Sequence, residues 1–394
     1  MPLAASTIYF FCLLGAYYLI RPVRDAFGVA SGIDKLPWLF TATFIVMLLI
    51  VPLWGWAVRR YTRARLVPGV YLAFIAQLLV FYGLLLGEIA PRIVAPVFFV
   101  WLSVFNLFVV SVFWSFMSEV WSSAQARRLF GLIAAGGSLG AVAGPAATAM
   151  LVDRVGAAPL LLISSTLLAL ALVAVRVIER RLSPHATQAS DPRGSVFDGV
   201  KLIIRSPYLG LIAVYVALYT LLSTFLYFEQ ARIVGEAFAD TAARTRWFAQ
   251  VDLAVNVLTL LAQVTATHRL VAWLGVGRTL ALIPAAVGVG LLALAFAPGL
   301  ILLAAVQIIR RAGNYALARP AREMLFTVVN RAERYQAKNA IDTLVYRGGD
   351  AAAGWAYKAL AAFGAPALAG VGMISAVAWA ITGLALGRRY RSRL

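Results

Sequence analysis

The sequence predicts an all-α membrane protein with twelve transmembrane helices arranged as two sets of six. Three observations predict this class. Hydrophobic residues make up 62% of the 394 positions and charged residues only 13%. Apolar runs long enough to cross a bilayer recur from one end of the chain to the other, and one hydrophilic stretch separates them into two sets. A soluble domain with a single core does not fit this composition.

The twelve runs each approach the length of about 20 residues that a helix needs to cross a hydrocarbon core of ~30 Å. In chain order they lie at 4–27, 37–58, 66–87, 93–117, 131–152, 157–178, 207–230, 246–267, 277–297, 299–318, 342–363 and 366–387. We therefore expect a six-helix N-terminal half at 1–178 and a central cytoplasmic linker at 179–206. A six-helix C-terminal half with a basic tail follows at 207–394.

The formal net charge of +19 comes largely from alternate loops. Lysine and arginine concentrate at 59–65, 126–128, 334–338 and 388–393, whereas the loops on the other side of the membrane carry few. Basic residues mark the cytoplasmic side of a membrane protein, so we expect both termini in the cytoplasm, most simply at a bacterial inner membrane. The expected partners are the lipid bilayer and a small anionic substrate; we expect a monomer and no nucleic-acid partner.

Several kinds of chemistry are not indicated. The sequence has no phosphate-binding loop and no HExxH. Its single cysteine, Cys12, excludes an internal disulfide, and its two histidines, His185 and His268, have no ligand partners at metal spacing. We therefore predict no enzyme activity, no metal and no cofactor.

Six plus six helices around a long central cytoplasmic loop resemble the major facilitator arrangement, in which two halves rock around a site near the membrane midplane. The loop motif at 55–65 and the glycine-rich motif at 131–145 are similar to two motifs of that superfamily, although Arg59 replaces the usual aspartate of the first. In the second, Gly136, Gly140 and Gly144 form a ridge of small residues that predicts close helix packing.

Charged residues inside the predicted helices are the candidates for function, because an Arg, Lys or Asp at a helix centre costs about 2.5 to 3.5 kcal/mol on insertion scales. The first helix carries Arg21, Arg24 and Asp25 around Pro22. The spacing of Arg21 and Asp25 allows them to pair on one helix face.

The tenth helix carries the adjacent Arg310 and Arg311, with Asn314 one turn further on, and the eleventh carries Arg347 and Lys358. In the expected arrangement the first and tenth helices both line the central cavity. Guanidinium groups there favour carboxylate and phosphate oxygens. We predict that an anionic substrate contacts Arg21, Arg24, Arg310, Asn314, Arg347 and Lys358.

An alternative is that these cations only pair with acids and lock the two halves together. The acids available for pairing or for ion coupling are Asp25, Glu119, Asp252 and Asp350. Asp252 and Glu229 are also candidate proton carriers.

Two stretches resemble the nucleotide transporter family of ATP/ADP translocase type and its bacterial relatives, within the major facilitators. The longer stretch is at 314–349, and its matching positions are Tyr315, Pro320, Arg322, Glu323, Met324, Lys338, Ile341, Asp342, Arg347 and Gly348. The shorter is at 113–128, and its matching positions are Phe113, Trp114, Glu119, Ala126, Arg127 and Arg128. The chain differs from the translocases at Asp350, where they tend to have a basic residue.

The resemblance implies nucleotide exchange. It also places Arg322, Glu323, Lys338 and Asp342 at the cytoplasmic mouth, where salt bridges can break and re-form as the halves move. The corresponding basic pair of the first half is Arg127 and Arg128; together these six residues form the predicted cytoplasmic gate.

We therefore expect a secondary active transporter that moves an anionic metabolite, and a nucleotide or a nucleotide-like phosphate compound above all. The alternatives are a proton-coupled carrier of another solute and a lipid-headgroup flippase.

Overall fold

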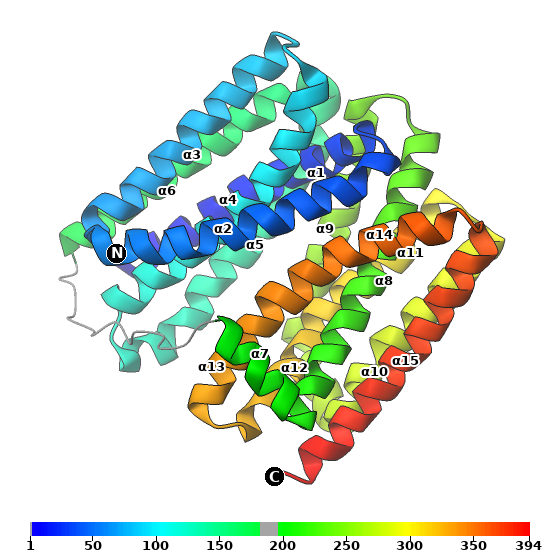
Figure 1. Ribbon diagram of the computed structural model, residues 1–394. Coiled ribbons are helices and arrows are strands. Elements are labelled where there is room, and N and C mark those ends of the chain that lie inside the picture. The colour runs from blue at the N-terminus through cyan, green and yellow to red at the C-terminus, as the bar shows by residue number, and fades with distance from the viewer. Residues whose placement is uncertain (1, 182–195) are drawn as a thin grey trace. The chain divides into compact units, whose positions relative to one another are not determined.

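The computed structural model describes residues 2–181 and 196–394, and these residues are almost entirely helical (Figure 1). The helices are α1 (Pro2–Ala30), α2 (Leu36–Arg60), α3 (Arg63–Leu86), α4 (Pro91–Val120), α5 (Ser123–Val155), α6 (Ala158–Arg181), α7 (Val196–Arg205), α8 (Pro207–Ala237), α9 (Thr241–Thr265), α10 (Thr267–Phe296), α11 (Leu300–Gly313), α12 (Arg319–Leu325), α13 (Arg331–Ala340), α14 (Gly349–Ala361) and α15 (Ala365–Arg391). Short 3-10 turns η1 (Ile33–Lys35) and η3 (Phe326–Val328) and π-helical segments η2 (Asn314–Ala318) and η4 (Ile341–Gly348) connect some of them.

Within the described residues, eleven helical segments are long and apolar enough to cross a membrane. They coincide with eleven of the twelve predicted runs. The run predicted at 342–363 is also helical, because η4 and α14 continue directly from α13, but it is not among the eleven. Its charged residues Asp342, Arg347, Asp350 and Lys358 lower its hydropathy below that of the other segments.

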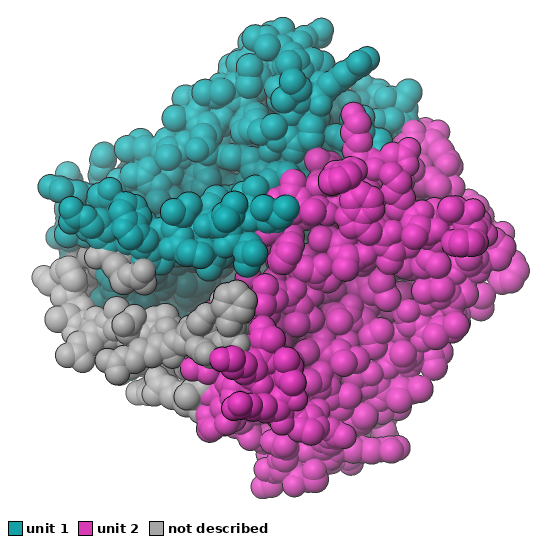
Figure 2. All heavy atoms as spheres, in the orientation of Figure 1, with its two compact units in different colours: residues 1–32, 45–189, 238–256 teal, residues 33–44, 190–237, 257–394 magenta. Residues whose placement is uncertain are grey.

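The chain divides into two compact units (Figure 2). Unit 1 comprises residues 1–32, 45–189 and 238–256, and unit 2 comprises the remainder. The helices α2 and α9 therefore each contribute to both units. The division into halves at 1–178 and 207–394 stays a prediction. Of the predicted linker, 182–195 lie outside the described residues, and its C-terminal part forms α7.

In unit 1, α1 is the central helix, and α4, α5 and α6 pack around it. The predicted glycine ridge on α5 is the reason that α1 can approach so closely. A Cβ atom on Gly140 would overlap the carbonyl oxygen of Phe11 and crowd the amide nitrogen of Gly15. Polar side chains secure the contact, since the Thr148 hydroxyl donates to the Leu19 carbonyl at 2.6 Å.

In unit 2, α8 packs against both α14 and α15, and α15 lies along α10 (Figure 1). The helix α10 is interrupted at Gly275, whose φ of 71° lies in the left-handed region that glycine tolerates. The segment η2 continues α11 beyond Arg310 and Arg311, and η4 precedes α14. Such π-helical segments interrupt the regular hydrogen-bond pattern of a helix and occur frequently at functional sites.

Candidate functional site

Arg310 is the most deeply placed of the predicted substrate-binding cations. It lies on α11, roughly 15 Å of helix from Leu300, and is buried. Its Nε and Nη2 donate to the Gln307 Oε1 at 3.2 and 2.7 Å, and its Nη1 donates to the Ser223 hydroxyl at 2.8 Å. Both partners are neutral, and no carboxylate of the described residues lies within ion-pair distance of Arg310.

Gln307 is held in turn by α8, because its Nε2 donates to the carbonyl of Leu226 at 3.2 Å. The side chain is buried together with Arg310. Because the amide nitrogen of Gln307 donates to α8, its amide oxygen points toward the guanidinium of Arg310. The two helices therefore orient Arg310 without neutralising it.

The predicted contact residue Asn314 begins η2 and belongs to the same cluster. Its Nδ2 donates to the Tyr219 hydroxyl on α8 at 3.2 Å. The Tyr219 ring lies 6.0 Å from the ring of Tyr346 and 5.6 Å from that of Trp379. Tyr219 of α8 is therefore in contact with the amide of Asn314 and with the rings of Tyr346 and Trp379.

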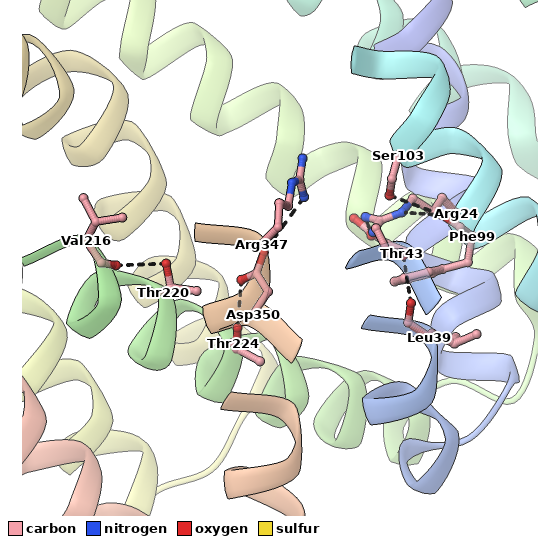
Figure 3. Close-up of polar contacts among 11 residues, drawn as sticks. Arg24, Leu39, Thr43, Phe99, Ser103, Val216, Thr220, Thr224, Arg347 and Asp350 are labelled. Atoms are coloured by element: carbon pink, nitrogen blue, oxygen red, sulfur yellow. Dashed lines mark hydrogen bonds and ion pairs between the residues drawn. The ribbon is translucent and has the colours of Figure 1, made fainter. Parts of the chain in front are cut away.

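Arg347 and Asp350 lie where η4 meets α14, and Asp350 contacts Thr224 of α8. Figure 3 shows Asp350 between Arg347 and Thr224: Thr224 donates to Asp350 Oδ1 at 3.1 Å, and Arg347 Nη1 lies 3.9 Å from Oδ2. This ion pair is long. The structure therefore gives Arg347 an acidic neighbour, unlike Arg310.

Lys358 does not contact the Arg310 cluster. It lies about 12 Å of helix beyond Asp350, and its Nζ is 3.8 Å from the exposed carboxylate of Asp34. The lysine side chain is itself partly exposed beside Trp355. Lys358 therefore lies near the end of α14 with exposed neighbours, and not in the Arg310 cluster.

In unit 1, Arg21 and Arg24 both contact acids. Arg21 Nη1 lies 3.4 Å from Asp252 Oδ1, and Arg24 Nη1 lies 3.2 Å from Asp25 Oδ1. Both carboxylates are buried. The sequence allowed Arg21 to pair with Asp25; the ion pairs described here are Arg24 with Asp25, and Arg21 with Asp252 from α9.

The ring of Phe99 completes the Arg24 site. Its centroid lies 3.8 Å from the guanidinium carbon, and its carbonyl accepts from Arg24 Nε at 3.2 Å (Figure 3). A guanidinium that stacks on a ring and binds a carboxylate is fixed on two sides. Glu119, the other predicted acid of this unit, is half-buried near the end of α4.

Four residues of the predicted cytoplasmic gate form two ion pairs within unit 2. Arg322 Nη2 lies 3.6 Å from Asp342 Oδ1, and Lys338 Nζ lies 2.6 Å from Glu323 Oε2. These contacts join α12 to α13 and η4. Of the first-half pair, Arg128 is exposed on α5, and the side chain of Arg127 lies outside the described residues.

Several members of the site were not predicted, among them Gln307, Ser223 and Phe99. The spacing of Gln307 and Arg310, three residues apart on one helix, indicates a shared face and was available from the sequence. Ser223 and Phe99 come from other helices, and no local pattern connects them with an arginine.

The sequence model of the Major Facilitator Superfamily matches residues 3–328. The chain belongs to this superfamily. It is accordingly an integral membrane protein and a secondary transporter, with the major facilitator fold that the sequence predicts.

Three solved structures illustrate the similarity. A peptide transporter of the POT family in complex with sulfate is 14% identical, with a TM-score of 0.69, and the match covers 100% of this chain and 95% of that one. The nucleoside transporter NupG is 11% identical, with a TM-score of 0.68 and 100% of each chain covered. An auto inhibited POT family peptide transporter is 14% identical, with a TM-score of 0.67 and coverage of 100% and 97%. No curated protein matches the sequence.

Proposed function

We propose that this transporter exchanges an anionic metabolite, a nucleotide or a nucleotide-like phosphate compound, by alternating access. The observation that supports this substrate class is Arg310, a buried guanidinium whose described partners are all neutral. A guanidinium has five N–H donors, and the described bonds use three of them. Two donors therefore stay available for an anion, in a medium of low dielectric that strengthens the attraction.

The surroundings of Arg310 support a substrate with a planar ring as well as a charge. The Tyr219 hydroxyl on α8 accepts from Asn314, and the Tyr219 ring lies 6.0 Å from the ring of Tyr346 on η4. Aromatic rings bind planar groups by stacking, and an amide can select among ring substituents. The resemblance to ATP/ADP translocases and the fold shared with a nucleoside transporter agree with this choice.

Exchange by alternating access agrees with the ion pairs Arg322–Asp342 and Lys338–Glu323. Both pairs are partly exposed, and such pairs contribute about 0 to 1 kcal/mol, so they break and re-form at small cost. The charge bias supports cytoplasmic termini and a bacterial inner membrane. We further propose that the protein works as a monomer.

The test is ligand binding to the purified protein. A ligand that binds the folded state raises the apparent melting temperature, so ATP, ADP, phosphate and a neutral nucleoside are compared at equal concentration. We expect the phosphate compounds to stabilise the wild type and not Arg310→Gln. The matched control is Arg205→Gln, which removes one exposed positive charge from α7. Stabilisation of Arg310→Gln equal to that of the wild type contradicts the proposal.

The contact of Asp350 with Thr224 and Arg347 favours a second candidate, a proton-coupled carrier. A carboxylate whose ion pair is long can exchange its proton when Arg347 moves to a substrate. The variant Asp350→Asn separates the two functions. It abolishes uptake driven by a proton gradient in vesicles but leaves gradient-free exchange in place if exchange is the function.

A further inference from the structure

A second cationic site lies in unit 2, away from the Arg310 cluster. A cavity of about 550 Å³ opens where the Gly275 kink of α10 meets the C-terminal turns of α15. Three arginines line it: Arg278, Arg388 and Arg391. Among the described residues, no acid lines it, and none of these arginines forms an ion pair. The pocket is therefore strongly positive.

The position of Arg278 is the most informative feature of this pocket. The helix restarts after Gly275, so Arg278 lies in its first turn. A cation there opposes the helix dipole, whose positive end is at the N-terminus. Arg388 and Arg391 have an ordinary explanation, since cations stabilise the C-terminal turn of α15. At Arg278 the dipole instead disfavours a cation, and an anion seated between the three guanidinium groups would offset this cost.

The wall of the pocket continues into an apolar surface. From Leu384, which lines the pocket, an exposed row on one face of α15 runs through Ile381 and Val377 to Ile374. These positions are three to four residues apart, so they form one stripe. Trp273 also lines the pocket and is 79% exposed; tryptophan is a residue type that anchors proteins at the membrane interface.

We propose that this pocket binds the headgroup of an anionic phospholipid, with an acyl chain along the α15 row. The cations at the C-terminal end of α15 belong to the side that the charge bias assigns to the cytoplasm, and basic pockets between helices on that side bind anionic headgroups. A free phosphate would use the arginines but not the apolar row. The site is separate from Arg310, so it does not depend on the proposed substrate.

The test measures lipid binding to the purified protein in neutral detergent by native mass spectrometry. The probes are phosphatidylglycerol, phosphatidylcholine with the same chains, and inorganic phosphate. The pocket variant is Arg278→Gln with Arg388→Gln. The matched control is Arg205→Gln with Arg389→Gln, which removes the same charge from exposed positions that do not line the pocket.

We expect phosphatidylglycerol to bind the wild type and the control with equal affinity and the pocket variant about tenfold more weakly, since two charge-assisted contacts are lost. The variant Arg278→Lys with Arg388→Lys keeps the charge and retains binding, which excludes misfolding as the cause. Equal losses in the pocket variant and the control overturn the site. Competition by millimolar phosphate overturns the lipid and indicates a free-anion site.

Discussion

Arg310 differs from Arg21, Arg24 and Arg347 in the chemistry of its neighbours. Arg21, Arg24 and Arg347 each contact a carboxylate, whereas Arg310 receives an amide oxygen and a hydroxyl. Removing a partner from a buried ion pair leaves an uncompensated charge, but a charge oriented by neutral groups is compensated only when an anion arrives. The distinction between a lock and a binding site can therefore be tested at single positions.

Gln307→Glu supplies Arg310 with a permanent counter-charge. We expect the dissociation constant of the anionic substrate to rise about tenfold or more, because the new carboxylate competes for the same N–H groups. Thermal stability without substrate should not fall. The measurement is isothermal titration of the best phosphate ligand. Gln263→Glu, an exposed position on α9, carries the same added charge and should bind as the wild type does.

In the pair Arg21–Asp252 the carboxylate is buried and the guanidinium is partly buried, and the two should behave as a coupled unit. We expect Asp252→Asn to destabilise the protein, and the double variant with Arg21→Met to recover much of the loss, giving a coupling energy of about 1 to 3 kcal/mol. Unfolding in mixed micelles measures it. The exposed pair Arg246–Asp153 is the control and should give less than about 1 kcal/mol. Equal coupling in both pairs would contradict the role of burial.

At the level of helices, the contact of α1 with α5 depends on residues that lack side chains. Gly136, Gly140 and Gly144 all meet the backbone of α1 at distances too short for a Cβ atom. The contact is therefore a close backbone packing, in which dispersion and small polar bonds replace the hydrophobic effect. Larger residues must push the helices apart.

Gly140→Ala should accordingly lower the free energy of unfolding by about 1 to 3 kcal/mol through overpacking. Gly131→Ala is the matched control, since a Cβ atom at Gly131 meets nothing within 4 Å, and alanine favours helix. It should be neutral or slightly stabilising. The thermal midpoints of both variants decide the question, and equal effects would show that the ridge does not limit the approach of α1.

At the level of the whole molecule, orientation in the membrane follows from the charge bias. The protein is suited to a cysteine test, because its only cysteine, Cys12, is buried on α1. In a Cys12→Ala background, we expect Ser392→Cys to be protected from an impermeant maleimide in intact cells and Arg92→Cys to be labelled. The reverse pattern would place both termini outside.

The sequence allowed the fold to be predicted more fully than the site. Apolar runs predict transmembrane helices well because each segment must be apolar by itself to lie in lipid, and eleven segments agree with the prediction. Contacts such as Ser223 with Arg310 and Phe99 with Arg24 join helices 75 or more residues apart. They depend on packing, which local pattern does not encode. Lys358 shows the converse, since a charge inside a predicted run proved to be a partly exposed end residue.

The polarity of η4 and α14 has a consequence for biosynthesis. A segment with four charged residues from Asp342 to Lys358 partitions poorly into lipid alone, so it must enter the bilayer beside partners that are already there. Those partners are on α8, where Thr224 binds Asp350 and Glu229 accepts from Tyr357. Ribosome-bound chains that lack α8 should therefore leave this segment outside the membrane, which glycosylation mapping during translation would detect.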